Sequence, residues 1–214
     1  MKRLCVAVAL AGWANTAAVM PTASANPCPD VEVIFARGTN GIGLSDVGQK
    51  FLDAVRARAG GRSVDVYSVN YPASFDFPNS VPIGVADASA RVQWMAANCP
   101  STRLVLSGLS QGAGVIDLIT MDQRPLGEWT PAPMPPDVAD HVAAVAVFGN
   151  PAGTLPGGGS LTTMSSLYGA KTIDLCVPDD MYCWPGGTSF LAHNAYSGNG
   201  MIEQAAEFVA ARLQ

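Results

Sequence analysis

The chain has 214 residues, with 12 lysines and arginines against 17 aspartates and glutamates, and a formal net charge of -5. It is long enough for one domain with a sizeable core. No cluster of basic residues occurs in it, which argues against a nucleic-acid partner or a polybasic membrane-binding segment.

The first 25 residues have the pattern of an export signal. Lys2 and Arg3 give a positive start, residues 4–14 are apolar, and Ala23-Ser24-Ala25 is a small-residue cleavage site. The apolar run is too short for a membrane span. We therefore expect a secreted protein, free or associated with the cell surface, whose single domain is residues 26–214. The signal holds two of the 12 basic residues and none of the 17 acidic ones, so the remaining chain has a net charge of −7.

Short aliphatic runs alternate with longer segments of helical periodicity along the rest of the chain. The expected strands are Val31–Ala36, Val64–Val69, Arg103–Ser107, Val142–Phe148 and Lys171–Leu175. The expected helices are Asp46–Ala59, Gly84–Asn98, Val115–Met121 and Met201–Leu213. Nearly continuous apolar runs are typical of parallel strands covered on both faces. The alternation predicts an α/β fold with right-handed crossovers around one sheet.

Two segments rich in proline or glycine interrupt this pattern. Arg124–Pro136 is proline-rich, and we expect a surface excursion there; the glycines of Gly153–Ser160 predict a flexible loop. Neither is long enough to divide the chain into domains.

The segment LVLSGLSQGAG, residues 104–114, contains a Gly-x-Ser-x-Gly pentapeptide centred on Ser110. It stands between an apolar strand and an apolar helix start, which is the setting of a nucleophile elbow. Gly108 and Gly112 lack the Cβ atoms that would crowd such a turn. A turn without chemistry is the alternative interpretation.

A serine hydroxyl is a weak nucleophile unless a neighbouring base takes its proton. The chain has two histidines, His141 and His193. His141 directly precedes a predicted strand, where we expect it to cap or pack. His193 lies near the end of the chain and satisfies the order serine, acid, histidine of the elbow folds.

Three aspartates precede His193 closely. Asp174 is inside a strand pattern, whereas Asp179 and Asp180 follow that strand at its carboxyl end, where α/β sheets place their sites. The residues by themselves leave Asp179 and Asp180 as equal candidates for the acid.

Four cysteines remain after the signal with Cys5 is removed: Cys28, Cys99, Cys176 and Cys183. An even number in an exported chain suggests disulfides, with three pairings open, and free buried thiols are the alternative. The absence of Cys-x-x-Cys and the distance between the histidines argue against zinc. We expect no metal and no cofactor.

Five segments resemble the cutinase family, most closely the secreted mycobacterial cutinase-like proteins. They are VIFARGT (33–39), YSVNYPAS (67–74), LSGLSQGA (106–113), CVPDDMYC (176–183) and LAHNAY (191–196). The resemblance runs from Cys28 nearly to the C-terminus. It implies a single-domain α/β-hydrolase-type three-layer sandwich with a central, mostly parallel five-stranded sheet.

The resemblance also implies the site. The family's nucleophile matches Ser110, its acid matches Asp180, and its base matches His193. Its oxyanion hole is similar to the backbone N–H groups of Thr39 and Gln111, with the Thr39 hydroxyl as a further donor.

Two positions depart from the family's pattern, and one pairing of cysteines follows from it. Leu109 stands where the family usually has Tyr, and Asp179 where it usually has Gly; the Asp179 charge is expected to disturb the neighbouring acid. The implied disulfides are Cys28–Cys99 and Cys176–Cys183, and the second would hold the loop that contains Asp180.

Apolar residues in loops near the serine and the histidine suit an acyl chain, although burial in the local core is the alternative. They are Phe75, Phe77, Trp184, Phe190 and Leu191. We expect a monomeric secreted serine esterase that hydrolyses short- to medium-chain acyl esters, of lipids or polyesters, in an open site with no lid and no deep tunnel. An acetylxylan-type carbohydrate esterase of the same fold and a non-catalytic, antigen-like surface protein are the alternatives.

Overall fold

A computed structural model describes residues 28–122 and 124–214, and the predicted export signal lies outside them. Five strands form one sheet in the order β2-β1-β3-β4-β5, and every neighbouring pair is parallel. The strands are β1 (Val31–Ala36), β2 (Val64–Ser68), β3 (Arg103–Leu109), β4 (Val142–Phe148) and β5 (Thr172–Leu175). The α/β fold predicted from the sequence is confirmed, with a sheet that is wholly parallel.

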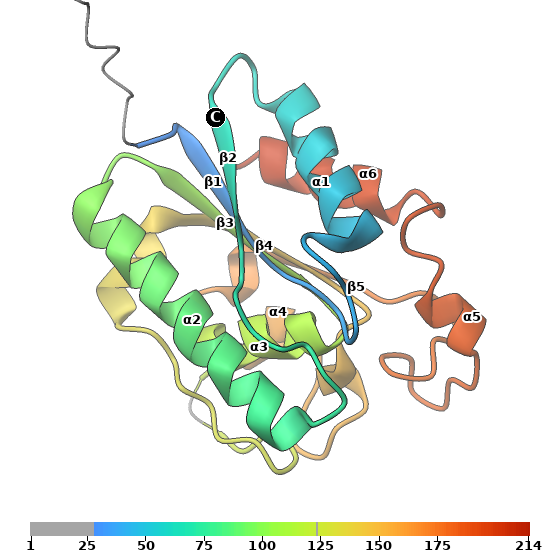
Figure 1. The fold of residues 1–214 in the computed structure, drawn as a ribbon. Helices are drawn as coiled ribbons and strands as arrows, with labels where there is room; N and C mark the ends of the chain where they lie inside the picture. Colours follow the sequence, from blue (N-terminus) through green and yellow to red (C-terminus); the bar gives the residue numbers. More distant parts are fainter. Residues whose placement is uncertain (1–27, 123) are drawn as a thin grey trace, which may run out of the picture.

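Helices cover both faces of this sheet (Figure 1). The longer ones are α1 (Ser45–Arg58), α2 (Phe77–Asn98), α3 (Gln111–Thr120) and α6 (Met201–Ala210). The short ones are α4 (Leu161–Met164), α5 (Phe190–His193) and the 3₁₀ turns η1 (Pro136–His141), η2 (Pro151–Gly153) and η3 (Gly169–Lys171).

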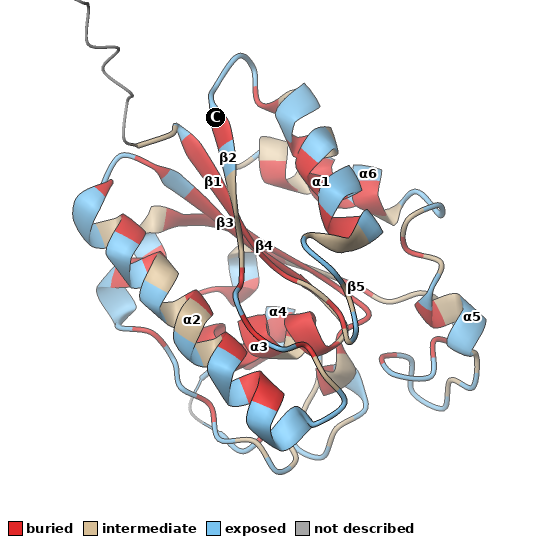
Figure 2. Ribbon diagram, in the orientation of Figure 1, coloured by how far each residue is buried: buried red, intermediate tan, exposed pale blue. Residues whose placement is uncertain are grey.

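The side chains of the strands contribute to two apolar cores, one on each face of the sheet. In β1, Val33 and Phe35 pack with α1 and α6, whereas Ile34 and Ala36 pack with α2 and α3. Alternate side chains of a strand point to opposite faces, so a strand apolar at every position serves both cores. Figure 2 shows the result: buried residues run along the central strands and along the helix faces turned toward the sheet. The outcome is a three-layer sandwich.

One helix is longer than its sequence pattern predicts. The sequence analysis expected a helix over Gly84–Asn98, yet α2 begins at Phe77. Pro78 falls in the first turn, where a backbone N–H has no helical partner to lose and the fixed φ of proline suits the helix. Phe77 therefore stands at a helix start and not in a loop.

The proline-rich segment Arg124–Pro136 runs over the surface, as we expected, but buried residues anchor it to the core. Leu126 and Met134 within it are buried, with exposed fractions of 1% and 4%. Its backbone N–H groups also reach the last turn of α3, where Ala132 donates to the Leu118 carbonyl at 2.8 Å and Met134 to the Ile119 carbonyl at 3.0 Å. Helix carbonyls at a C-terminus lack intrahelical donors, and this segment supplies them.

Both disulfides have the pairing that the family resemblance implied. Cys28–Cys99 ties the chain just before β1 to the end of α2, and Cys176–Cys183 closes the loop after β5. Across residues 28–122 and 124–214, no helix has the length and hydropathy that crossing a membrane requires.

Candidate active site

Ser110 occupies a sharp turn between β3 and α3, with φ 55° and ψ −119°. A non-glycine residue with positive φ is uncommon and costs free energy. The turn is compact because two glycines flank it. A Cβ on Gly108 would lie 2.3 Å from the Gly112 carbonyl oxygen, and a Cβ on Gly112 would lie 2.0 Å from the Ala36 carbonyl oxygen. Both glycines are therefore sterically required, and the serine hydroxyl stands at the carboxyl end of the sheet.

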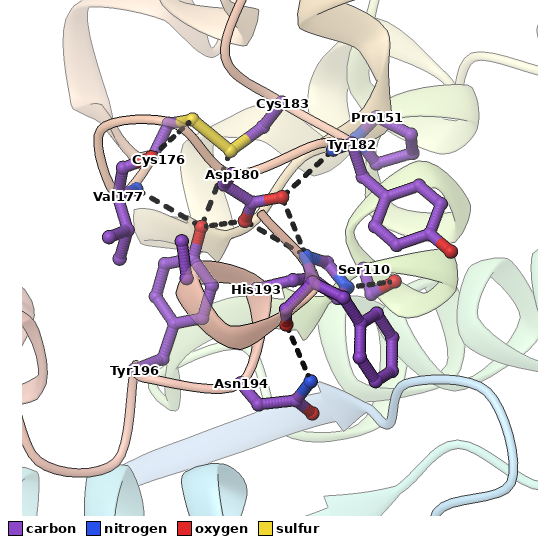
Figure 3. A network of polar contacts seen from close by, with 12 residues as sticks. Ser110, Pro151, Cys176, Val177, Asp180, Tyr182, Cys183, His193, Asn194 and Tyr196 are labelled. Atoms are coloured by element: carbon purple, nitrogen blue, oxygen red, sulfur yellow. Dashed lines mark hydrogen bonds and ion pairs between the residues drawn. A yellow bond between two sulfur atoms is a disulfide. The ribbon is translucent and has the colours of Figure 1, made fainter. Parts of the chain in front are cut away.

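His193 lies between Ser110 and Asp180 (Figure 3). Its Nε2 is 2.9 Å from the Ser110 Oγ, and its Nδ1 is 2.8 and 2.9 Å from the two Asp180 carboxylate oxygens. Asp180 is fully buried and His193 is 9% exposed. The three side chains come from the β3–α3 turn, the loop after β5 and the short helix α5, so residues 83 positions apart in the chain meet at one point.

Asp180 has two donors besides the histidine. The backbone N–H of Tyr182 donates to Oδ1 at 2.9 Å, and the Tyr196 hydroxyl donates to Oδ2 at 2.5 Å. Burial, and then the bond to Asp180, raise the pKa of Tyr196, so this phenol keeps its proton. The same hydroxyl oxygen accepts from the Val177 N–H at 3.2 Å. The sequence analysis assigned Tyr196 no role, although it closes the LAHNAY segment three residues after His193.

Asp179 turns away from the histidine. Its φ is 66°, in the left-handed region that glycine adopts readily, which explains why the family's glycine can stand at this position. The exposed carboxylate accepts from the Thr188 N–H at 2.9 Å and the Thr188 hydroxyl at 3.3 Å. Of the two candidate acids, Asp180 alone contacts His193. The expected disturbance by the Asp179 charge finds no contact that would carry it.

Thr39 and Gln111 line the cleft beside Ser110. The backbone N–H of neither residue donates a hydrogen bond to another described residue. The Gln111 side chain joins their two segments, because its Nε2 donates to the Thr39 Oγ1 at 3.2 Å and to the Ser74 carbonyl at 2.8 Å. The Thr39 hydroxyl is thus an acceptor for Gln111 and keeps its own proton for another partner.

Arg37 braces the loop that carries Thr39. Its guanidinium donates to the carbonyls of Gly41, at 2.8 Å, and Val69, at 3.1 Å, and also to the carbonyl of Tyr71. The Tyr71 hydroxyl donates back to the Arg37 carbonyl, and burial raises the pKa of this tyrosine, which keeps it a donor. The loop is therefore held in place before any ligand arrives.

A cleft of about 350 Å³ opens at Ser110. Phe75, Phe77 and Phe190 line it, as the sequence analysis expected, and so does Leu109. Trp184 and Leu191 do not line it; they are 44% and 83% exposed outside it. Sequence reasoning missed a further set of lining residues: Val81, Gly114, Leu118, Leu126, Trp129, Pro151, Leu155, Tyr182 and Asn194.

The periodicity of α3 could have indicated part of this set. Gly114 and Leu118 follow Ser110 at intervals of four, so the three lie along one side of the helix. Tyr182 also borders the histidine, with 4.5 Å between the phenol and imidazole ring centroids. Leu126 and Trp129 come from the proline-rich segment, and Pro151 and Leu155 follow β4. Val81 lies on α2 and Asn194 directly follows α5. No local pattern predicts that these residues line the cleft.

Two other groups of chemically capable residues do not contribute to this site. His141 precedes β4, at the end of the parallel sheet opposite to Ser110. Within the described residues, one set of three has metal-ligand spacing: Cys176, Asp180 and Cys183. Its two sulfur atoms are joined in a disulfide and offer no thiolate.

Comparisons with known proteins identify the family. Residues 27–213 match the family model described as Cutinase. The chain is 52% identical over 196 residues to Carboxylesterase Culp1 of Mycobacterium tuberculosis, covering 89% of this chain and 85% of that protein. It is 46% identical over 199 residues to Phospholipase Culp4 of the same organism, covering 92% and 84%.

Solved structures share the fold. A Trichoderma reesei cutinase in complex with a phosphonate inhibitor matches with a TM-score of 0.68 and 28% identity, covering 88% of this chain and 78% of that one. An acetylxylan esterase matches with a TM-score of 0.74 and 23% identity, covering 87% and 100%. The second likeness concerns the fold alone.

Proposed function

Because the chain belongs to the cutinase family, we propose that it is a serine carboxylesterase that uses Ser110, His193 and Asp180 as its triad. The observation that carries this proposal is the unbroken series of contacts from the Ser110 hydroxyl through His193 to Asp180, at a strained elbow that opens into an apolar cleft. A nucleophile bonded to a base that a third group orients is the signature of covalent acyl transfer.

The geometry supports the following reaction. His193 Nε2 takes the proton of the Ser110 hydroxyl as Oγ attacks the ester carbonyl carbon, and Asp180 holds the Nδ1–H and stabilises the imidazolium. The carbonyl oxygen becomes an oxyanion within reach of the Thr39 and Gln111 N–H groups. His193 then protonates the leaving alkoxide. Water enters and loses a proton to His193 as its oxygen attacks the acyl carbon; the bond from that carbon to Oγ then breaks, His193 returns the proton to the Ser110 Oγ, and the carboxylic acid leaves.

The polar surroundings support the same assignment. Preorganised donors stabilise developing charge because they need no reorganisation during the reaction. Gln111 and Arg37 hold the two N–H groups in place, and Tyr196 together with the Cys176–Cys183 loop holds Asp180. Tyr196 is thus a positioning residue and touches no reacting atom.

The cleft supports an acyl ester as substrate. Apart from Thr39, Gln111, Asn194 and the triad, its lining side chains are predominantly apolar, which suits an acyl chain better than a sugar. The relatives named carboxylesterase and phospholipase act on such esters by their names. We further propose export through residues 1–25, which is consistent with two disulfides in the mature domain.

The test combines hydrolysis with covalent labelling. We expect the chain without residues 1–25 to hydrolyse p-nitrophenyl butyrate, and a fluorophosphonate to modify Ser110, identified by peptide mass spectrometry. Ser110→Ala should lower kcat by about 10⁴-fold or more. Ser101→Ala, at an exposed turn before β3, is the matched serine control. A Ser110→Ala variant that kept a tenth of the activity, or a label on another serine, would refute the assignment.

A paired substrate assay addresses the carbohydrate-esterase alternative. We expect tributyrin to be hydrolysed and acetylated xylan to be a poor substrate. The reverse order would favour the acetylxylan interpretation, and no turnover of either would favour the non-catalytic one.

A further inference from the structure

The histidine of the proposed triad is nearly buried, although the segment that carries it is exposed. His193 is 9% exposed and ends α5, a helix of four residues whose Phe190 and Leu191 are 58% and 83% exposed. Its two ring nitrogens contact Asp180 and Ser110. A helix this short and exposed contributes little packing of its own, so other segments must cover the imidazole and fix the angle of its ring.

One side of the imidazole is covered by the end of β4 and by Tyr196. Gly149 directly follows β4 with φ 56°, and a Cβ there would lie 3.0 Å from the His193 Cε1 and 3.1 Å from the Tyr196 Cε2. The Tyr196 ring stands at 85° to the imidazole, with 6.2 Å between the centroids. A side chain at Gly149 would crowd the histidine, so this side of the ring is closely packed.

Tyr182 covers the imidazole from another direction (Figure 3). The centroids of the phenol and imidazole rings are 4.5 Å apart and the ring planes meet at 63°, which is an edge-to-face contact. The Tyr182 ring is therefore nearer to the imidazole than the Tyr196 ring is. Tyr182 also lines the cleft beside Ser110 and is 40% exposed. One part of its ring thus contacts the histidine, and another part faces the cleft.

The backbone of Tyr182 is held at several points, which fixes the position of its ring. The N–H donates to the Asp180 Oδ1 at 2.9 Å, and the carbonyl accepts from the Thr154 Oγ1 at 2.8 Å. The next residue, Cys183, belongs to a disulfide. The phenol hydroxyl, by contrast, has no hydrogen-bond partner among the residues that the structure describes. The side chain therefore supports His193 through its ring and not through a hydrogen bond.

Cover over the imidazole affects its contact with Asp180. A hydrogen bond between a carboxylate and an imidazole N–H is stronger where water is excluded, because the local dielectric constant is lower and no water competes for either group. A packed ring also restricts rotation of the imidazole away from Asp180 and Ser110. Groups that are held in the reacting geometry in advance lower the barrier of the step that they assist.

We propose that Tyr182 is a positioning residue, whose ring excludes water from the contact between Asp180 and His193 and keeps the His193 Nε2 on the Ser110 hydroxyl. This inference rests on the proposed esterase function and adds one residue to the support of its base. It requires the ring and not the hydroxyl. Phenylalanine should therefore serve at position 182 as well as tyrosine does, whereas a small side chain should not.

Kinetics of three variants on p-nitrophenyl butyrate test the proposal. Tyr182→Ala should lower kcat by about tenfold, because the contact that supports a charged pair is lost. Tyr182→Phe keeps the ring and should stay within about twofold of the wild type. Trp184→Ala is the matched control, because Trp184 is an aromatic residue of the same loop that is 44% exposed and lies outside the cleft. It should leave kcat unchanged. A Tyr182→Ala variant with the wild-type kcat, or a Tyr182→Phe variant as impaired as Tyr182→Ala, would overturn the proposal.

Proton NMR gives a second readout that does not depend on turnover. An imidazole N–H that is bonded to a carboxylate and shielded from water exchanges slowly and gives a sharp signal far downfield. In the chain without residues 1–25 we expect this signal from the His193 Nδ1–H, identified by its absence in Asp180→Asn. It should persist in Tyr182→Phe and Trp184→Ala and should broaden through exchange with water in Tyr182→Ala.

The NMR result also separates this inference from the esterase function. An equally sharp signal in Tyr182→Ala, or no such signal in the wild type, would overturn the role of Tyr182. The expected pattern of signals in a chain that hydrolyses no ester would support the role of Tyr182 in placing His193 and would refute the esterase proposal.

Discussion

Two aspartates, Asp117 and Asp180, are fully buried among the residues that the structure describes, and their surroundings differ. Asp180 accepts hydrogen bonds from His193, from the Tyr182 N–H and from the Tyr196 hydroxyl. Asp117, on α3, has one donor, the Asn150 Nδ2 at 3.2 Å on Oδ1, and its Oδ2 has no partner within the described part of the chain. The two aspartates are thus equally buried, but Asp180 has several hydrogen-bond donors and Asp117 has one.

The poorly provided aspartate also has an acidic neighbour. Burial first, and then repulsion by Asp174, raise the pKa of Asp117 well above its ordinary value, and the bond from Asn150 offsets this only in part. Asn150 also donates to Asp174 at 3.2 Å, so one amide serves both carboxyl groups. The comparison teaches that donors convert a buried carboxyl group into an oriented acceptor. A buried carboxyl group without such donors favours its protonated, neutral form, and its burial lowers the stability of the folded state.

The largest expected effect is on turnover, from substitution of Asp180, the carboxylate with several hydrogen-bond donors. Asp180→Asn should lower kcat by about 10³–10⁴-fold, because an amide can hold the wrong tautomer of His193. Near-ultraviolet circular dichroism should show that the fold persists. The comparison would break if Asp117→Asn lowered activity to the same degree.

The next effect concerns the donor that distinguishes the two sites. Tyr196→Phe removes one hydrogen bond to a charged group, worth about 1.5–3 kcal/mol, and should lower kcat/KM by about tenfold. The acid limb of the pH–rate profile should also move to higher pH, since a carboxylate with one donor fewer attracts the imidazole proton more strongly. A purely structural role would lower activity without moving that limb.

Tyr168→Phe is the matched control for Tyr196→Phe. The Tyr168 hydroxyl is buried and has no hydrogen-bond partner among the described residues. Its removal should leave the pH profile in place and should not lower the melting temperature, because an unpartnered polar group is removed from the core.

Substitution of Asp117, which has a single hydrogen-bond donor, should change stability and not turnover. Because the folded state raises the pKa of Asp117, its contribution to stability is present below the ordinary value of 3.8 and is lost as the pH rises toward the folded-state value. Asp117→Asn removes this loss. At pH 7 the variant should be more stable by about 1–3 kcal/mol, or a few degrees in Tm, with unchanged kcat/KM.

The pH dependence of that gain is the sharper measurement. The difference in Tm between the Asp117→Asn variant and the wild type should grow from pH 4 toward neutrality. A difference that stayed constant over this range would mean that Asp117 does not titrate between the folded and unfolded states.

The smallest effect is expected from the third acidic residue, Asp179. Asp179→Gly relieves a positive φ and loses the bonds to Thr188, two changes of opposite sign in stability. Because its carboxylate does not contact His193, turnover should stay near that of the wild type. A loss comparable to that of Asp180→Asn would mean that the loop places Asp179, and not Asp180, against the histidine.

Local patterns in the sequence were sufficient for the five strands and for two of the three residues of the proposed triad, Ser110 and His193, but not for the bounds of every helix. The apolar runs located all five strands, and the glycines beside Ser110 predicted the elbow, because both depend on residues close in the chain. The choice of Asp180 over Asp179 and the disulfide pairing came from the resemblance to a family, since spacing left both open. Backbone geometry then gave the physical reason: Asp179 occupies a left-handed position that turns its side chain toward Thr188.

Only the tertiary structure decided which residues line the cleft and which partners the buried polar groups have, because segments distant in the chain pack against one another there. Trp184 and Leu191 are near His193 in sequence but lie outside the cleft, whereas Leu126 and Trp129, more than 60 positions before that histidine, line it. Tyr196 acquires its partner because the loop after β5 folds over it. In the sequence, Asp117 is a single acidic residue in an apolar helix. In the fold, burial and the neighbouring Asp174 raise its pKa, and the bond from Asn150 offsets this only in part. The sequence by itself determined which groups can react, and the packing of loops on α3 determined what they can bind, because the free energy of burying an acyl chain depends on which surfaces meet.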